Sequence, residues 1–253
     1  MIRADNITKK FGDQEVLKGI STTFEEGKTN LIIGRSGAGK TVLLKTLIGL
    51  VKPTSGIVWY DDVNFTALDK AAERAVRMQV GMLFQGSALF DSMTVEQNVR
   101  FPLDMFTNFS KKQKDERVNY CLERVGLAGI NVKYPSETSG GMQKRVGIAR
   151  AIVLNPKYLF CDEPNSGLDP KTSIIIDELI HSITIENNIT TVINTHDMNS
   201  VMEIGDTICF IHEGCLEWRG NKNEVLESPN QELQSFMFAS PFLQRLRERA
   251  LSK

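Results

Sequence analysis

The chain opens with short runs in which polar and apolar residues alternate. Residues 1–12 and 15–27 both show this pattern, and each run ends at a glycine. Alternation with a period of two, closed by a turn residue, is typical of antiparallel strands. We therefore expect an antiparallel β subdomain at the N-terminus.

Short, mostly apolar runs recur along the rest of the chain and predict further strands. Strands that are covered on both faces of a sheet have this continuous pattern. Residues 171–187 place apolar side chains at helical spacing between two such runs, which predicts a βαβ crossover. The predicted strands are residues 29–34, 56–62, 80–84, 157–162, 190–195 and 207–214.

Between about residues 91 and 156 the pattern changes to helices, and strand signals almost disappear. Residues 110–127 give the clearest helix, with Val118, Leu122 and Val125 on one face. We interpret the segment 91–156 as a helical insertion into an α/β core.

The composition is that of an ordinary globular protein. Hydrophobic residues make up 41% and charged residues 24% of the 253 positions, and 30 basic residues stand against 31 acidic ones. This balance excludes a disordered chain and a nucleic-acid binder that relies on bulk positive charge. The chain has neither the apolar stretch of a secretory signal nor a run of the ~20 apolar residues that a membrane helix needs. We expect a soluble protein that stays in the compartment where it is made.

The four cysteines argue against a disulfide framework and a structural zinc site. They show no CxxC spacing and do not pair with the three histidines. Cys161 and Cys209 lie inside apolar runs, so we expect buried, reduced thiols and a cytosolic location.

A glycine-rich segment between a predicted strand and a predicted helix carries the clearest chemistry. Residues 34–41 read G-R-S-G-A-G-K-T and match the phosphate-binding pattern G-x-x-x-x-G-K-[ST]. Glycines let the backbone wrap around phosphates, and successive N–H groups together with the helix N-terminus attract negative charge. Lys40 would reach the β- and γ-phosphates and the Thr41 hydroxyl would ligate Mg²⁺. The nucleotide-binding residues are Gly34, Ser36, Gly37, Ala38, Gly39, Lys40 and Thr41.

Two adjacent carboxylates stand at the end of the predicted strand 157–162: Asp162 is its last residue and Glu163 follows it. Asp162 can hold Mg²⁺ through water and Glu163 can face an attacking water molecule. A solvated strand end is the plainer interpretation of such a pair. Together with Lys40, the pair predicts nucleotide hydrolysis.

A second phosphate-binding helix terminus is predicted at residues 139–141. Ser139 is placed to cap a helix, and Gly140 and Gly141 leave its first N–H groups bare. A capped helix alone would be the simpler interpretation. One nucleotide held between the Lys40 loop of one subunit and this helix of another explains both sites, so we expect a homodimer.

In this order and spacing the motifs resemble the nucleotide-binding subunit of ATP-binding cassette (ABC) transporters, over residues 1–220. The resemblance implies an α/β fold with a P-loop (RecA-like) core, an N-terminal antiparallel β subdomain and an α-helical insertion. It also implies ATP and Mg²⁺ as cofactors.

The resemblance assigns roles to residues outside the phosphate loop. Gln85 resembles the Q-loop glutamine, Ser139 to Gln143 the signature, residues 166–169 the D-loop with its Asp169, and His196 the switch histidine. Phe11 resembles the aromatic residue that stacks on adenine. The implied catalytic residues are Glu163, His196, Gln85 and Lys40, and the implied magnesium ligands are Thr41, Gln85 and Asp162.

Several of these residues have plainer interpretations. A histidine after an apolar strand is more often structural than catalytic, Phe11 can pack within its hairpin, and Gln85 can be a solvated loop residue. The signature also departs from the usual Leu-Ser-Gly-Gly-Gln, because Thr138 and Met142 replace its first and last residues. The phosphate-facing residues Ser139, Gly140 and Gly141 remain, so we expect the contact with ATP to be retained. Asn165 stands where Thr or an aromatic residue is frequent, and the sequence does not explain it.

Residues 81–103 discriminate among the members of the family. They are similar to the ATPases of MCE-type lipid transport, the Mla and Mkl branch. That branch implies phospholipid transport between the two membranes of a bacterium, with an integral membrane permease and an MCE-type substrate-binding protein as partners. It implies a peripheral location at the cytoplasmic face of the inner membrane. An apolar cluster is expected to receive a permease helix unless the insertion buries it; its residues are Phe84, Leu89, Phe90 and Met93.

Two other functions remain open. The chain can be the ATPase of a small-solute importer, or a cassette ATPase that regulates cell-wall enzymes in division. A chromosome or repair ATPase is disfavoured because no long coiled coil separates Lys40 from Asp162, and a GTPase because no Asn-Lys-x-Asp motif occurs. We expect no nucleic-acid partner.

Residues 221–253 form a separate tail in this interpretation. Its apolar side chains are too many for a free terminus, and we expect it to be helical and to dock on the partner copy, with docking on its own subunit as the alternative. The residues concerned are Phe236, Phe238, Phe242, Leu243 and Leu246, beside Arg245, Arg247 and Arg249.

Overall fold

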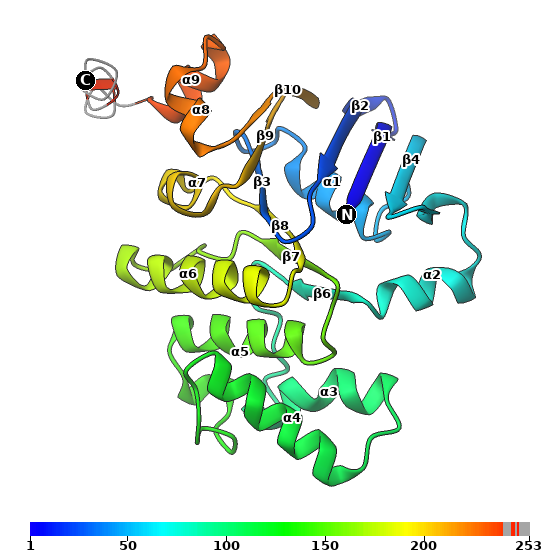
Figure 1. The fold of residues 1–253 in the computed structure, drawn as a ribbon, viewed down its shortest axis with the longest axis vertical. Helices are drawn as coiled ribbons and strands as arrows, with labels where there is room; N and C mark the ends of the chain where they lie inside the picture. The colour runs from blue at the N-terminus through cyan, green and yellow to red at the C-terminus, as the bar shows by residue number, and fades with distance from the viewer. Residues whose placement is uncertain (240–243, 246, 248–253) are drawn as a thin grey trace.

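The computed structural model describes residues 1–239, 244–245 and 247. Its strands form two sheets (Figure 1). The predicted residues Phe242, Leu243, Leu246 and Arg249 lie outside the described part of the chain. No helix in the described residues is both long enough and apolar enough to span a membrane.

The N-terminal runs form an antiparallel sheet, as their alternation predicts. Its order is β2 (Gln14–Phe24), β1 (Ile2–Phe11), β4 (Ser55–Tyr60) and β5 (Val63–Asn64). One face of the sheet is buried along the N-terminal half of β1 and the C-terminal part of β2. This face packs on α1 (Lys40–Leu47), whose Leu43, Leu44 and Leu47 belong to the same apolar cluster.

The core sheet has six strands, five of them parallel. Its order is β10 (Cys215–Gly220), β9 (Thr207–His212), β3 (Thr29–Ile33), β8 (Thr190–Asn194), β7 (Tyr158–Asp162) and β6 (Val80–Leu83). Every residue of β3, β7 and β8 is buried, which confirms strands covered on both faces. Helix α6 (Pro170–Glu186) connects the parallel neighbours β7 and β8, as predicted.

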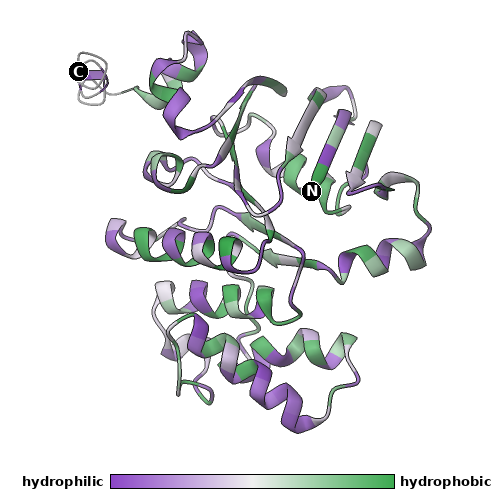
Figure 2. Cartoon of the chain, viewed as in Figure 1, coloured by the Kyte–Doolittle hydropathy of each residue, from purple (hydrophilic) through white to green (hydrophobic). Residues whose placement is uncertain are grey.

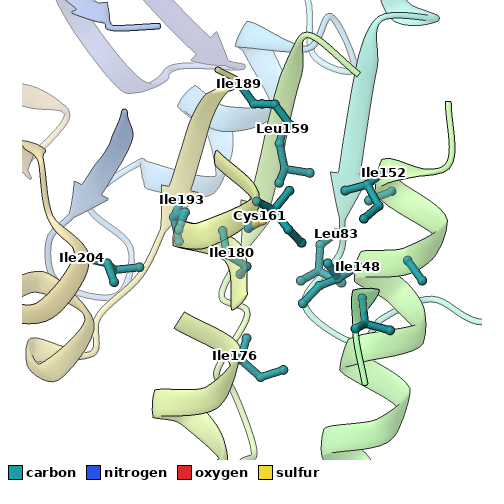
Figure 3. Close-up of a cluster of buried hydrophobic side chains, with 14 of the residues drawn as sticks. Leu83, Ile148, Ile152, Leu159, Cys161, Ile176, Ile180, Ile189, Ile193 and Ile204 are labelled. Atoms are coloured by element: carbon teal, nitrogen blue, oxygen red, sulfur yellow. The ribbon is translucent and has the colours of Figure 1, made fainter. Parts of the chain in front are cut away.

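A layer of helices covers the face of the core sheet that is opposite α1. In Figure 1, α5 (Gly140–Ile152) and α6 lie under the sheet, with α3 (Val95–Phe106) and α4 (Lys111–Arg124) beyond them. Figure 2 shows hydrophobic and hydrophilic residues interspersed around α5 and α6. Figure 3 shows side chains of the sheet and both helices converging on one cluster, which includes Leu83, Ile148, Leu159, Cys161, Ile176 and Ile180. Val118, Leu122 and Val125 are buried, as predicted for one face of a helix.

Three short α-helices and the strands β5 and β10 of the described residues were not predicted from the sequence. Helix α2 (Lys70–Arg77) buries no residue fully, and only Val76 of it packs against a core cluster. Strand β10 forms a hairpin with β9 in the segment that follows the predicted strand. The remaining two helices are α7 (Met198–Ile204) and α8 (Lys222–Glu227).

The described part of the C-terminal tail packs on its own subunit. In α9 (Gln231–Met237) and just after it, Phe236 stacks on Phe210 of β9 with ring centroids 5.3 Å apart, and Phe238 is buried. Arg247 Nε donates to the carbonyl of Leu226 at 2.8 Å. Phe236 and Phe238 therefore pack on their own subunit, as the alternative interpretation expected, and docking of the tail on a partner copy stays a prediction.

Candidate nucleotide-binding and hydrolysis site

The glycine-rich loop connects β3 to α1 in a conformation that requires glycine. Gly34 has φ +149°, and a Cβ there would lie 2.2 Å from the carbonyl oxygen of Ile211. Gly39 has φ +104° and caps α1 in the left-handed region. The backbone thus curls tightly in front of the α1 N-terminus, as a phosphate-binding loop must.

Lys40 turns back onto this loop. Its Nζ donates to the carbonyl oxygens of Gly34 at 2.9 Å and Arg35 at 3.2 Å, and the residue is buried. Burial lowers the pKa of Lys40, while the nearby carboxylates of Glu163 and Asp162 raise it. The ammonium group is therefore desolvated and held at the point where the loop would receive a phosphate.

Asp162 and Thr41 face each other across the end of β7. The Thr41 hydroxyl donates to Asp162 Oδ1 at 3.4 Å, and Asp162 is 7% exposed. A third residue, Asn194 at the end of β8, donates through Nδ2 to Asp162 Oδ1 at 2.5 Å and to Thr41 Oγ1 at 3.0 Å. Sequence reasoning missed Asn194; the only signal is a polar residue at the end of an otherwise buried strand.

Glu163 lies directly after β7, where three predicted residues meet. Its backbone has φ +48° and its N–H donates to the carbonyl of Asn194 at 2.9 Å. Its carboxylate accepts from Gln85 Nε2 at 2.8 Å, and His196 Nδ1 lies 3.3 Å from the other oxygen. Both carboxylate oxygens are therefore engaged, and the side chain has a fixed orientation.

Lys144, a buried residue of α5, contacts the backbone of both Gln85 and Glu163. Lys144 Nζ contacts the carbonyl oxygen of Gln85 and lies 3.5 Å from that of Glu163. Burial lowers the pKa of Lys144. Nearby groups, which include Glu163 and Asp162, act in the opposite direction and raise it. A single lysine on a helix gives no sequence signal for this role.

Ser139, Gly140, Gly141 and Asp169 gather at a different place. Ser139 caps α5, as predicted, with its Oγ accepting from the Met142 N–H at 3.3 Å. Asp169 caps α6 through the N–H groups of Lys171 and Thr172. These residues line a hollow of about 440 Å³ that no residue of loop 34–41 lines. Within one chain, the phosphate loop and this hollow are therefore separate.

The signature departures have structural explanations. The Thr138 hydroxyl donates to the carbonyl of Pro135 at 2.7 Å, so it closes the turn before α5. Met142 packs against the main core cluster. Asn165 donates from Nδ2 to Asp177 Oδ1 at 2.9 Å and to Ser200 Oγ at 3.1 Å, and thereby joins the D-loop to α6 and α7.

Two further residues, Phe11 and Gln85, were predicted to contact the nucleotide or its metal ion. Phe11 is 49% exposed, with Lys9 Nζ 4.8 Å from its ring centroid, so it does not pack inside its hairpin. Gln85 contacts Glu163 and lies 3.5 Å from Ser166. Adenine stacking by Phe11 and magnesium ligation by Gln85 stay predictions.

A largely apolar groove, which Lys70, Glu73, Arg74, Arg77 and Arg150 also line, lies beside the Q-loop. It has a volume of about 870 Å³. Of the predicted cluster, Phe84 and Phe90 line it and are 38% and 41% exposed. Leu89 instead packs against the core, as the burial alternative expected. The other apolar residues of the groove are Met78, Val80, Met82, Ala88, Phe101, Pro102, Phe106, Ala151 and Leu154.

Known proteins match this chain along most of its length. A family model described as ABC transporter matches residues 17–166. The methionine import ATP-binding protein MetN of Carboxydothermus hydrogenoformans is 43% identical over 215 residues, covering 85% of this chain and 64% of that protein. The probable ribonucleotide transport ATP-binding protein mkl of Mycobacterium bovis is 35% identical over 236 residues, covering 93% of this chain and 66% of that protein. The chain thus spans just under two thirds of the length of these relatives.

Solved structures share the fold. A dimeric ATP-binding cassette in a post-hydrolysis state, bound to ADP and Pi, superposes with a TM-score of 0.80 at 32% identity, covering 88% of this chain and 99% of the other. The cbiO1 protein from Clostridium perfringens, part of an ABC transporter complex, gives a TM-score of 0.84 at 28% identity over 99% and 98% of the two chains. The fold expected from the motifs is confirmed.

Proposed function

The chain belongs to the ABC transporter family, and from this premise we propose that it is the ATP-hydrolysing subunit of a membrane transporter that works as a homodimer. The observation that carries the proposal is the convergence of Gln85 and His196 on Glu163, next to Lys40 and the pair Thr41–Asp162. Structural elements far apart in the sequence supply these groups, so their convergence is a property of the fold.

Loop 34–41 binds the phosphates of ATP in this proposal. Its N–H groups and the first turn of α1 supply positive potential. Lys40 is buried and held against the carbonyls of Gly34 and Arg35. Phosphate oxygens are stronger acceptors for an ammonium group than neutral carbonyls, so bound ATP would take over these hydrogen bonds.

The pair Thr41–Asp162 fits Mg²⁺. A hydroxyl and a carboxylate are the hard oxygen donors that this ion prefers, and here they lie 3.4 Å apart at the mouth of the phosphate loop. Thr41 and Asp162 would hold the ion, which when bound neutralises charge on the β- and γ-phosphates.

Glu163 acts as the general base in this proposal. Gln85 and His196 orient its carboxylate, and Lys144 anchors the backbone on which Glu163 and Gln85 sit. A base must be aimed at the proton it accepts, and this fixed orientation satisfies the requirement. His196 has an exposed side chain, so it is available to a nucleotide as well as to Glu163.

Two chains complete each site in this proposal. The hollow formed by Ser139, Gly140, Gly141 and Asp169 presents helix N–H groups without any residue of the phosphate loop. A second copy placed head to tail would bring each Lys40 loop opposite such a hollow. The dimeric, ADP-bound cassette with 32% identity supports this arrangement.

The apolar groove beside the Q-loop is the proposed docking surface for a permease helix. Two of its aromatic residues, Phe84 and Phe90, lie on either side of Gln85 in the chain, so a helix seated there would act directly on the Glu163 contact. Such docking would place the subunit at the cytoplasmic face of the inner membrane.

We favour a phospholipid as the transported substrate, with an MCE-type protein as a further partner. The similarity of residues 81–103 to the Mla and Mkl branch supports this choice, and an mkl protein is among the relatives. Import of a small solute is the second candidate, because a protein named for methionine import is 43% identical.

Co-purification from native membranes tests the partner assignment. The parental chain should retain a permease, and Phe90→Asp should lose it because a charge enters the apolar groove. Val132→Asp is the matched control, since Val132 is 78% exposed and outside the groove. An MCE-type protein in the complex supports lipid transport, whereas a small-solute receptor supports import. Retention of the permease by Phe90→Asp would contradict the docking surface.

A further inference from the structure

The side chain of Asn194 occupies an unusual place in the site. It is fully buried at the carboxyl end of β8, and its Nδ2 reaches both Asp162 Oδ1 and Thr41 Oγ1. A carboxylate can only accept hydrogen bonds, so the amide nitrogen must be the atom that faces Asp162. The amide oxygen therefore points the other way.

That oxygen has no hydrogen-bond partner among the residues that the structure describes. An unpaired buried polar atom costs free energy, and folded proteins rarely keep one without a reason. The neighbouring residues Val192 and Ile193 are apolar, and a valine would continue the strand without this cost.

Strand pairing does not need the Asn194 side chain. The backbone of Asn194 already pairs in register with Asp162 of β7, and its carbonyl accepts the Glu163 N–H. The amide side chain therefore adds nothing to the sheet ladder. What it adds is a link between the two residues that would hold Mg²⁺.

We propose that Asn194 is a positioning residue of the magnesium site, an inference that rests on the proposed function. Its Nδ2 fixes the Asp162 carboxylate and the Thr41 hydroxyl relative to each other. The amide does this without adding charge beside Lys40.

The test is the magnesium dependence of nucleotide binding. A fluorescent ATP analogue is titrated in EDTA and again at rising Mg²⁺ concentrations, with parental protein, Asn194→Val and Thr191→Val. Removing an outer partner of a metal ligand typically weakens metal affinity about 10–100-fold. Asn194→Val should raise the half-saturating Mg²⁺ concentration by about this factor and leave the affinity in EDTA near the parental value.

Thr191→Val is the matched control on the same strand. Thr191 is also fully buried, and its hydroxyl lies 2.6 Å from that of Thr184, away from the site. This variant should lose stability but keep the parental Mg²⁺ dependence. A parental Mg²⁺ dependence in Asn194→Val would reduce Asn194 to a packing residue and overturn the inference.

A second variant covers the case in which Asn194→Val does not fold. Asn194→Asp keeps the shape of the side chain and places a second carboxylate beside Asp162. Without nucleotide, Mg²⁺ should then raise the Tm of the variant more than that of the parental protein. An equal Tm shift would overturn the inference. Parental protein that binds the analogue without any Mg²⁺ dependence would instead contradict the proposed function, and the inference with it.

Discussion

At the residue scale, the motif residues hold their positions through partners that no motif contains. The sequence predicts Glu163, Gln85, His196 and Lys40 because the order of the motifs is specific. It does not predict Lys144 or Asn194, because an isolated lysine on a helix and a polar strand end are common. Their roles exist only after folding brings residues together from distant parts of the chain.

Asp177 gives a pH prediction at the same scale. Burial raises the pKa of this carboxyl to about 6, against the hydrogen bonds from Ser200 and Asn165 that lower it, with Asp197 and Glu203 adding to the rise. The unfolded group titrates near 3.8. The folded state therefore binds more protons between these values, and stability falls as the pH rises from about 4 to above 6.

The shift corresponds to a loss on the order of 3 kcal/mol once Asp177 is fully charged, since one pKa unit is worth about 1.4 kcal/mol. The isosteric variant Asp177→Asn should not show this decline. Urea unfolding at intervals between pH 4 and pH 8 measures the difference between the two curves. Parallel curves would show that Asp177 does not carry the pH dependence.

At the element scale, local patterns predict strands and capped helices well. The buried strands β3, β7 and β8 and the capped helix α5 were predicted because each has a local signal. Helix α2 was missed because it buries no residue fully, and the short apolar pattern of α9 does not reveal that β9 receives it. Which surface covers an apolar face depends on long-range packing.

The connection between the Q-loop and α3 depends on one buried side chain. Asn98 donates from Nδ2 to the carbonyls of Phe90, Met93 and Thr94, and its Oδ1 accepts the Phe90 N–H at 2.8 Å. Replacing it by leucine leaves buried backbone groups unpaired, each at a cost of about 1–3 kcal/mol.

Asn98→Leu should therefore lower the free energy of unfolding by roughly 3 kcal/mol or more in urea titrations. The control Asn187→Ala removes one amide hydrogen bond at the exposed end of α6, and should cost no more than about 1 kcal/mol. Equal effects of the two variants would mean that Asn98 is not the residue that holds this segment.

At the scale of the whole molecule, the proposed homodimer holds each nucleotide between two chains. Lys40→Ala removes the charge from one half-site. Gly140→Asp places a carboxylate in the other half-site, where a Cβ meets nothing closer than Leu168 Cδ2 at 3.8 Å, so the fold should tolerate it. Neither variant alone should hydrolyse ATP.

A mixture of the two variants should regain hydrolysis. In a mixed dimer both defects fall in one composite site, which leaves the other site intact. Phosphate release from the mixture, compared with each variant alone, measures this recovery. Absence of recovery in a mixture that is shown to contain mixed dimers would contradict shared sites.

We propose that Glu163 is the general base of ATP hydrolysis, and the variant Glu163→Gln is the sharpest test of this role. The amide keeps the size of the side chain but cannot accept a proton, and general-base catalysis contributes on the order of 10²–10⁴-fold. The phosphate loop and the pair Thr41–Asp162 are untouched, so ATP should still bind.

The measurement is phosphate release alongside ATP-dependent dimerisation by size-exclusion chromatography. Glu186→Gln is the control, because Glu186 is an exposed carboxylate that pairs with Arg124 away from the site. The account predicts that Glu163→Gln loses about two to four orders of magnitude in rate. It should also form a longer-lived ATP-bound dimer, since one negative charge near the γ-phosphate is gone. Hydrolysis by Glu163→Gln at the parental rate would contradict the account.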